Sequence, residues 1–177
     1  DGARILRQEP IAELAGLRRQ AVEITGASAT DNVVSFGAER VTEIDLVLDV
    51  SRASDAWLSL ARGEVGGKLQ EVRVGIDVAK GVFYLDRTKG GLQTVPGRDG
   101  GEAQFALRRE VAYRPADGRV RLHVYLDRSS VEVFVDDGAP AGSFLVFNDP
   151  SAQGLALGAT GTATIASGHL TPLGPAF

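Results

Sequence analysis

Cysteine and methionine are both missing from this 177-residue chain, and histidine and tryptophan are scarce. Without cysteine, the chain can form no disulfide bond, no zinc–thiolate site and no thiol nucleophile. The two histidines are His123 and His169, and His123 falls on the polar face of a predicted strand, which is typical of a surface residue rather than a catalytic base. The sequence therefore predicts no metal site and no cofactor. Because position 1 is Asp rather than Met, we expect a processed chain or a fragment.

An excess of basic charge is also missing. The 19 Lys and Arg residues are outnumbered by 23 Asp and Glu residues, which gives a net charge of -4 and a pI near 5.2. Proteins that hold nucleic acid mainly through phosphate contacts need clustered basic residues, so this composition disfavours a nucleic-acid partner. The sequence contains no apolar run of membrane-spanning length, and we expect no membrane partner.

Alternation of apolar and polar residues is the dominant pattern of the chain, and it is clearest at 119–147. Val120, Leu122 and Val124 alternate with polar residues, which indicates a strand with one buried face. The interruption at 128–130 predicts a bend or bulge, and Asp136-Asp137-Gly138 predicts a tight reversal. We expect the returning strand at 143–147, so that the whole stretch forms a long antiparallel hairpin.

Further short strands are predicted along the rest of the chain, which makes the fold all-β. Their expected ranges are 21–25, 33–36, 40–50, 56–61, 69–77, 82–86, 103–109, 154–157, 162–166 and 169–173. The segment 88–101 contains five glycines and one proline and is predicted to be a long exposed loop. Many short alternating strands without long helices are typical of a two-sheet antiparallel β-sandwich in a single domain.

A short helical turn is expected near the N-terminus, because Pro10 suits the first position of a helix. Ile11, Leu14 and Leu17 follow at intervals of three and form a narrow apolar stripe. The stripe has two interpretations. The turn either covers one edge of the sandwich or meets a partner domain.

Three motifs carry a resemblance to a known family. Residues 127–135 read DRSSVEVFV, residues 6–10 read LRQEP and are followed by Glu13-Leu14 and Leu17-Arg18, and residues 84–87 read YLDR. In this order they resemble the C-terminal β-sandwich of glycoside hydrolase family 32, which includes invertases, inulinases and levanases. The similarity extends from residue 4 to residue 173.

The resemblance implies a concanavalin-like or lectin-like sandwich at 20–177. It also implies that 1–19 form a linker, with its short helix, leading from a catalytic β-propeller that is the expected partner. Ile11, Leu14 and Leu17 would then belong to the interface between the two domains. Fructan or fructose is a candidate ligand, and a secreted or extracellular location is favoured for a fructan-degrading enzyme, although the sequence leaves the compartment open.

Charged residues gather in the two Asp-Arg motifs, Asp86-Arg87 and Asp127-Arg128, and in the nearby Glu132. Each motif ends an alternating run, so we expect the two to lie close together, with Glu132 as a partner for an arginine. Structural ion pairs at strand ends are one interpretation of this cluster, and a carbohydrate-binding site is the other.

A catalytic pair is not expected. Asn148-Asp149-Pro150 resembles the family's nucleophile-bearing element, but that element lies in the propeller, far upstream of the sandwich, so a turn is the better interpretation here. The family's Arg-Asp-Pro and Glu-Cys elements have no match in these residues. Glycoside cleavage needs two carboxylates in defined roles, and the sequence therefore predicts no catalytic residue.

Two functions from different classes remain. The first is a non-catalytic module that stabilises the catalytic propeller and its cleft in an enzyme that cleaves fructan or sucrose. The second is a lectin-like module that binds fructan by itself through the charged residues named above. Trp57 bears weakly on the choice, because its apolar strand favours core burial whereas strand parity places it opposite Leu58 and Leu60 and would allow display to a sugar.

Overall fold

The computed structural model describes residues 6–138 and 140–175, which are mostly β-structure. The predicted linker, 1–19, is thus described from residue 6 onward. The elements are a 3-10 helix η1 (Ala12–Leu17) and the strands β1 (Val22–Glu23), β2 (Ser28–Thr30), β3 (Val33–Ala38), β4 (Thr42–Val65), β5 (Lys68–Asp77), β6 (Val82–Asp86), β7 (Thr94–Pro96), β8 (Glu102–Gln104), β9 (Arg108–Ala112), β10 (Arg119–Leu126), β11 (Ser130–Val135), β12 (Ala141–Leu145) and β13 (Gly154–Pro172).

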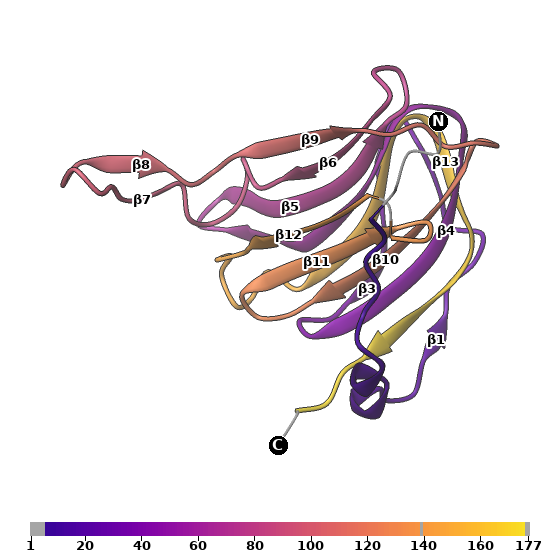
Figure 1. Ribbon diagram of the computed structural model, residues 1–177, viewed down its shortest axis with the longest axis horizontal. Helices are drawn as coiled ribbons and strands as arrows, with labels where there is room; N and C mark the ends of the chain where they lie inside the picture. The colour runs from indigo at the N-terminus through magenta and orange to yellow at the C-terminus, as the bar shows by residue number, and fades with distance from the viewer. Residues whose placement is uncertain (1–5, 139, 176–177) are drawn as a thin grey trace.

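The long strands β4 and β13 hold the two layers of the fold together. Residues 42–49 of β4 pair with β10, residues 55–65 pair with β5, and β13 runs antiparallel beside most of β4. The first layer continues from β10 to β11 and β12, and the second layer continues from β5 to β6 and β9. Figure 1 shows β9, β6 and β5 above β12, β11 and β10, with β4 and β13 curving between them. The predicted antiparallel sandwich is confirmed.

Both long strands were predicted as several shorter ones, and this is a correction. β4 unites 40–50 with 56–61, and β13 unites the three strands expected between 154 and 173. Bulges let each strand bend between the layers without losing its partner, because the register between β4 and β13 shifts at several points, including Thr160/Gly161. Gly161 has a φ of 78°, and a Cβ there would lie 2.5 Å from the carbonyl oxygen of Arg52. The bend therefore requires glycine at this position.

The stretch at 119–147 contains two reversals rather than one. β10 pairs with β11 up to Leu126 and Val131, and the amide of Asp127 donates to the carbonyl of Ser130 at 2.9 Å. The predicted bend at 128–130 is therefore a hairpin turn, and the reversal at 136–138 is confirmed. The result is a meander of β10, β11 and β12, whose last strand spans Ala141–Leu145 rather than 143–147.

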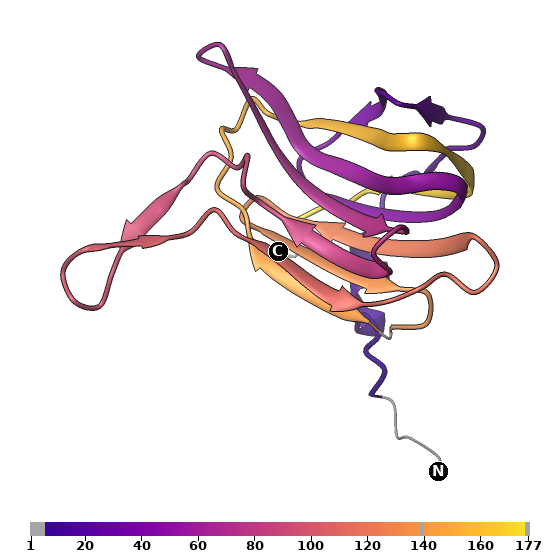
Figure 2. The same ribbon diagram turned by 90° about the horizontal axis from the view of Figure 1, so that it is seen from above.

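The predicted loop at 88–101 contains half of a β-hairpin. β7 pairs with β8, and Figures 1 and 2 show this arm projecting away from the two layers. The strand expected at 103–109 is consequently divided between β8 and β9. The interruption between β8 and β9 lies at Phe105 and Ala106. The amides of both residues donate to the carbonyl of Gln93, which joins the two segments at the base of the arm.

The core lies between the two layers and follows the predicted alternation. Ile44, Leu46 and Leu48 are fully buried, and so are Leu122 and Val124 on the neighbouring β10. Burial of each such side chain stabilises the fold by about 1.5–3 kcal/mol. This gain explains why the apolar faces of both strands point into the space between the layers. Within the described residues, no helix combines the length and apolar character needed to cross a bilayer.

Trp57 is buried, which is the more favoured of the two predicted environments. It is 8% exposed, but it lies outside the hydrophobic core cluster, on the outer side of the second layer. The guanidinium carbon of Arg73 lies 4.4 Å from the centroid of its ring, and Gly158 lies directly beneath the ring, where an added Cβ would be 2.2 Å from it. Trp57 is therefore buried between an arginine and a glycine and is not displayed.

Candidate functional site

The N-terminal segment is attached to the outer face of the first layer. The amide of Gln8 donates to the carbonyl of Gly138 at 3.1 Å, Arg7 forms an ion pair with Asp137, and the amide of Arg19 donates to Pro172 at 2.9 Å. In Figure 1 the segment runs beside β10 and β11 to η1 at the foot of the sandwich. The predicted linker is thus fixed at both ends of its described length.

Glu43 on β4 is the main anchor for this segment. It is 4% exposed, and it accepts hydrogen bonds from Arg18 Nε at 2.5 Å and Arg18 Nη2 at 2.7 Å. His123 Nε2 lies 2.7 Å from the same carboxylate, and the Tyr125 hydroxyl donates to it at 3.0 Å. A buried carboxylate with these partners is a strong attachment, because the loss of Arg18 would leave the charge of Glu43 without its cation.

The hydrogen bonds around Glu43 shift the pKa values of Glu43 and Tyr125. Burial by itself would raise the pKa of Glu43, but the hydrogen bonds from Arg18, His123 and Tyr125 outweigh it and bring the pKa to about 2. Burial, together with the nearby Glu43 carboxylate, raises the pKa of Tyr125 to about 12. Glu43 is therefore a charged structural group at neutral pH, and its low pKa does not suit a general acid.

Two grooves open beside this anchor. The first, of about 370 Å³, lies between residues 8–15 of the linker and the aromatic rings of His123, Tyr125 and Phe134, whose centroids are 5.0–6.5 Å apart. The second, of about 670 Å³, is called the linker groove here. Its lining includes Leu14, Leu17, Tyr125, Asp127, Arg128, Glu132 and Leu173.

The linker groove brings together two sets of residues that the sequence treated separately. Leu14 and Leu17 come from the predicted interface stripe, whereas Asp127, Arg128 and Glu132 come from the predicted carbohydrate site. Both leucines are only half-buried, and Ile11, in the neighbouring groove, is 66% exposed. The stripe is therefore accessible to a partner, and its role as an interface stays a prediction.

Asp86 and Arg87 do not line the linker groove, so the residues expected to form a single cluster are divided among separate cavities. Asp86 accepts from the amide and hydroxyl of Thr88 at 2.8 and 2.7 Å and lies 3.7 Å from Arg108 Nη1. Arg87 donates to the carbonyls of Phe105 and Leu145 at 2.7 and 3.1 Å.

Among the described ion pairs, none joins the two Asp-Arg motifs and none involves Glu132. The physical reason is topological. Asp86 ends a strand of the second layer, whereas Asp127 follows a strand of the first layer.

Asn148 and Asp149 form the predicted turn. Asn148 accepts from the amide of Gly91 at 2.9 Å and donates to the carbonyl of Ala61 at 2.8 Å. Asp149 accepts from the amide and hydroxyl of Ser151 at 2.9 and 2.6 Å, and these bonds lower its pKa. Both side chains form hydrogen bonds with backbone groups, as is usual for Asx residues in turns.

A second buried acid, Glu71, is also occupied by structural partners. It is 1% exposed and accepts from Ser59 and from Arg73 Nε at 2.8 Å, while Lys89 Nζ lies 3.6 Å away. The adjoining cavity of about 30 Å³ has room for about one water molecule. Within the described residues, no group of three or more His, Cys, Asp or Glu side chains is arranged to hold a metal ion.

Sequence reasoning missed Glu43 as a site residue. The one available signal was its parity, because Glu43 and Asp45 fall opposite the buried run that begins at Ile44. His123 was correctly assigned to the polar face of its strand, but its partner lies 80 positions away in the sequence. Only the pairing of Tyr125 with Glu43 across β10 and β4 reveals the contact.

Comparisons with known proteins agree on one family. The family described as "Glycosyl hydrolases family 32 C terminal" matches residues 13–172. A levanase from Bacillus subtilis is 30% identical over 178 residues, which covers 98% of this chain but 25% of the levanase. A sucrose-6-phosphate hydrolase from Zymomonas mobilis is 34% identical over 104 residues, which covers 59% of this chain and 18% of that protein.

Solved structures show the same fold. An exo-inulinase from Aspergillus awamori superimposes with a TM-score of 0.80 at 23% identity, over 100% of this chain and 34% of the inulinase. The galectin LEC-6 from Caenorhabditis elegans gives a TM-score of 0.55 at 14% identity, over 84% of this chain and 94% of the galectin. The chain therefore spans a quarter or less of the sequence relatives named above. It belongs to glycoside hydrolase family 32, of which it represents the C-terminal β-sandwich domain.

Proposed function

We propose that this chain is the non-catalytic part of an enzyme that cleaves β-fructofuranosyl bonds in fructan or sucrose, and that it stabilises a catalytic domain joined to its N-terminus. The names of the relatives support the substrate class, because they include levanases, a sucrose-6-phosphate hydrolase and a fructan beta-fructosidase. The partial coverage of those relatives supports the accessory role, since each is several times longer than this chain.

The observation that carries the proposal is an apolar surface that faces solvent although its backbone is fixed. Arg18 and Glu43 hold the linker on the sandwich, yet Ile11, Leu14 and Leu17 remain accessible beside the two grooves. A contiguous apolar surface next to a domain connection is typical of an interface. The catalytic domain would bury it, and the charged rim of Asp127 and Arg128 would then lie at the edge of the contact.

The experiment uses the polypeptide encoded by the complete gene and compares it with the double variant Leu14→Asp, Leu17→Asp. We expect the variant to lose levan-hydrolysing activity faster on heating, because two carboxylates would be placed in an apolar interface. Leu69→Asp is a matched control, since Leu69 is a 38% exposed leucine on β5, in the second layer. Equal inactivation rates for the double variant and the parent protein, or a complete gene that encodes no catalytic domain, would contradict the proposal.

A second candidate function is fructan binding in the linker groove. It is favoured by one observation, which is that Asp127, Arg128 and Glu132 line a groove of about 670 Å³ together with Tyr125. Grooves of this size with a few polar groups suit oligosaccharide-sized ligands. Levan titrated into the chain should bind, and Arg128→Ala should abolish binding without lowering the thermal midpoint. An absence of levan binding by the parent chain would eliminate this function and leave the stabilising role.

A further inference from the structure

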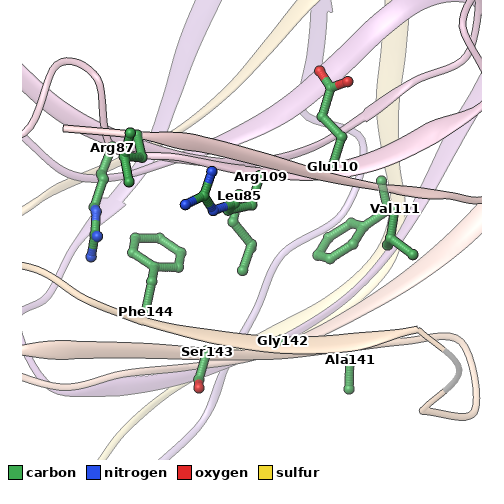
Figure 3. Close-up of a pocket in the computed structure, with 11 residues that line it drawn as sticks. Leu85, Arg87, Arg109, Glu110, Val111, Ala141, Gly142, Ser143 and Phe144 are labelled. Atoms are coloured by element: carbon green, nitrogen blue, oxygen red, sulfur yellow. The ribbon is translucent and has the colours of Figure 1, made fainter. Parts of the chain in front are cut away.

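The two ends of the continuous sheet face each other on the side of the sandwich away from β4 and β13. β9 is the last strand of the second layer and β12 is the last strand of the first. Between them lies a groove of about 400 Å³, drawn in Figure 3 and called the edge groove here. None of the residues predicted to form an interface lines the edge groove, and of the predicted carbohydrate residues Arg87 alone does.

Apolar side chains form most of the wall of the edge groove. Leu85 and Phe144 project into it from opposite strands in Figure 3, and Val111, which is 45% exposed, lies at its far end. Gly142 keeps the space open, because a Cβ at this position would lie 2.9 Å from Leu85 Cδ1. The groove can therefore receive an apolar body several atoms long.

The charged side chains that face into the edge groove are both arginines. Arg87 and Arg109 both line it, and Figure 3 shows Arg87 at the end away from Val111, with Arg109 next along the groove beside Leu85. Glu110 also borders the groove, but it points away from β12 and pairs with Arg108, whose Nε lies 2.6 Å from its carboxylate. Among the described ion pairs and side-chain hydrogen bonds, none involves Arg109, so no carboxylate of the described residues neutralises this end.

The two arginines differ in how many of their N–H groups are already hydrogen-bonded. Arg87 stacks on the ring of Phe105, with its guanidinium carbon 3.7 Å from the centroid, and already donates to two carbonyls. Burial, and then the charge of Arg109, lower the pKa of Arg87, which is the effect expected of two cations held close together. An anion at this end would relieve that repulsion, and the guanidinium of Arg109 can present two parallel N–H groups to it.

We propose that the edge groove is a binding site for a small amphipathic carboxylate. The carboxylate lies against the guanidinium of Arg109, with Arg87 as a second positive charge, and the aliphatic body of the ligand lies between Leu85 and Phe144. The volume of the groove falls in the range of small-molecule sites, and its combination of apolar walls with a few convergent polar groups is characteristic of them. A neutral alcohol of the same length lacks the attraction, and acetate lacks the apolar contact.

The test is a titration of the isotope-labelled chain with octanoate, octanol and acetate, followed by amide chemical shifts. Octanoate should saturate and shift the amides of β6, β9 and β12, whereas octanol and acetate at the same concentration should produce much smaller shifts. Arg109→Gln should weaken octanoate binding about tenfold or more, as expected when a charge-assisted contact is lost. Arg98→Gln, an exposed arginine between the two strands of the arm, removes the same charge and should change nothing.

The variant is expected to fold, because Arg109 is exposed and has no partner among the described residues; an unchanged thermal midpoint would verify this. If Arg109→Gln is nevertheless unstable, Arg109→Lys keeps the charge, loses the paired N–H groups and should bind octanoate less tightly than the parent chain. Equal affinity for octanol and octanoate, equal weakening by Arg98→Gln, or shifts confined to the linker groove would each overturn the proposal. This site is independent of the proposed stabilising role, since neither Leu14 nor Leu17 lines the edge groove.

Discussion

At the scale of single residues, Glu43 connects the linker to the sandwich. Four hydrogen-bonding atoms from three side chains surround its carboxylate, and they come from the linker and from the neighbouring strand β10. The desolvation of a buried carboxylate is costly unless its lone pairs are all occupied. Glu43 therefore stabilises the attachment of the linker only while it is ionised.

A pH prediction follows from the low pKa. The pKa of Glu43 falls from an ordinary 4.5 to about 2 in the folded chain, so its contribution is complete above pH 4.5 and is lost as the pH falls towards 2. Glu43→Gln should lower the free energy of unfolding by about 1–3 kcal/mol at pH 7. Urea denaturation at pH 7 and at pH 2 measures the difference, which should shrink at pH 2, where the parent carboxyl is also becoming neutral.

Glu13→Gln is the matched control, because Glu13 lies exposed in the first turn of η1. It should leave the free energy of unfolding nearly unchanged at both pH values. A stability gap for Glu43→Gln that is as large at pH 2 as at pH 7 would show that ionisation of Glu43 is not the source of the effect.

At the scale of elements, the packing of β13 against β4 requires a small residue where a bulky side chain of β4 lies over β13. Gly158 on β13 lies opposite Trp57 on β4, and its missing side chain provides the surface on which the indole ring packs. The guanidinium of Arg73 also stacks on the ring. This packing fixes the only tryptophan of the chain on the outer side of the second layer.

Gly158→Ala should destabilise the chain by about 1–3 kcal/mol, since the new Cβ would overlap the indole ring and force it to move. Thermal unfolding measures the loss, and the emission of Trp57 should shift to longer wavelength as the ring becomes more exposed. Gly16→Ala, with open space around its Cβ position and no positive φ, should be tolerated without an emission change. An unshifted spectrum and unchanged midpoint for Gly158→Ala would refute the packing argument.

At the scale of the whole molecule, the chain is a sandwich with its N-terminal segment held against one layer. It matches only part of longer proteins, because it covers 25% of the levanase from Bacillus subtilis and about a third of the exo-inulinase. The acids of the described residues that have low pKa values, such as Glu43 and Asp149, are engaged in structural hydrogen bonds. A retaining or inverting glycosidase needs an acid–carboxylate pair poised across a cleft.

We therefore expect the purified chain to release no fructose from sucrose, inulin or levan. Asp149→Ala should leave this result unchanged and lower stability only slightly, because Asp149 is an exposed turn residue bonded to Ser151. Reducing-sugar assays on both proteins provide the measurement. Fructose release by the parent chain that disappears in Asp149→Ala would assign Asp149 a catalytic role instead.

The sequence by itself determined which residues face the core. The alternation in 44–50 and 120–126 depends only on the two-residue period of a strand, which is a local property. The family motifs predicted the sandwich, and the turn at 136–138 followed from the residue types that tolerate positive φ. These features need no knowledge of what lies across the fold.

Only the tertiary structure decided which layer each strand joins and which charged residues meet. Residues 51–55 of β4 read as a break because their alternation fails, yet β13 pairs with them across more than a hundred positions of sequence. For the same reason the two Asp-Arg motifs look equivalent in sequence but lie in different layers. Likewise, Arg18 pairs with Glu43 on β4 and not with a residue of its own turn. Strand pairing is set by burial summed over the whole sandwich, so a local pattern specifies the face of a residue but not its partner.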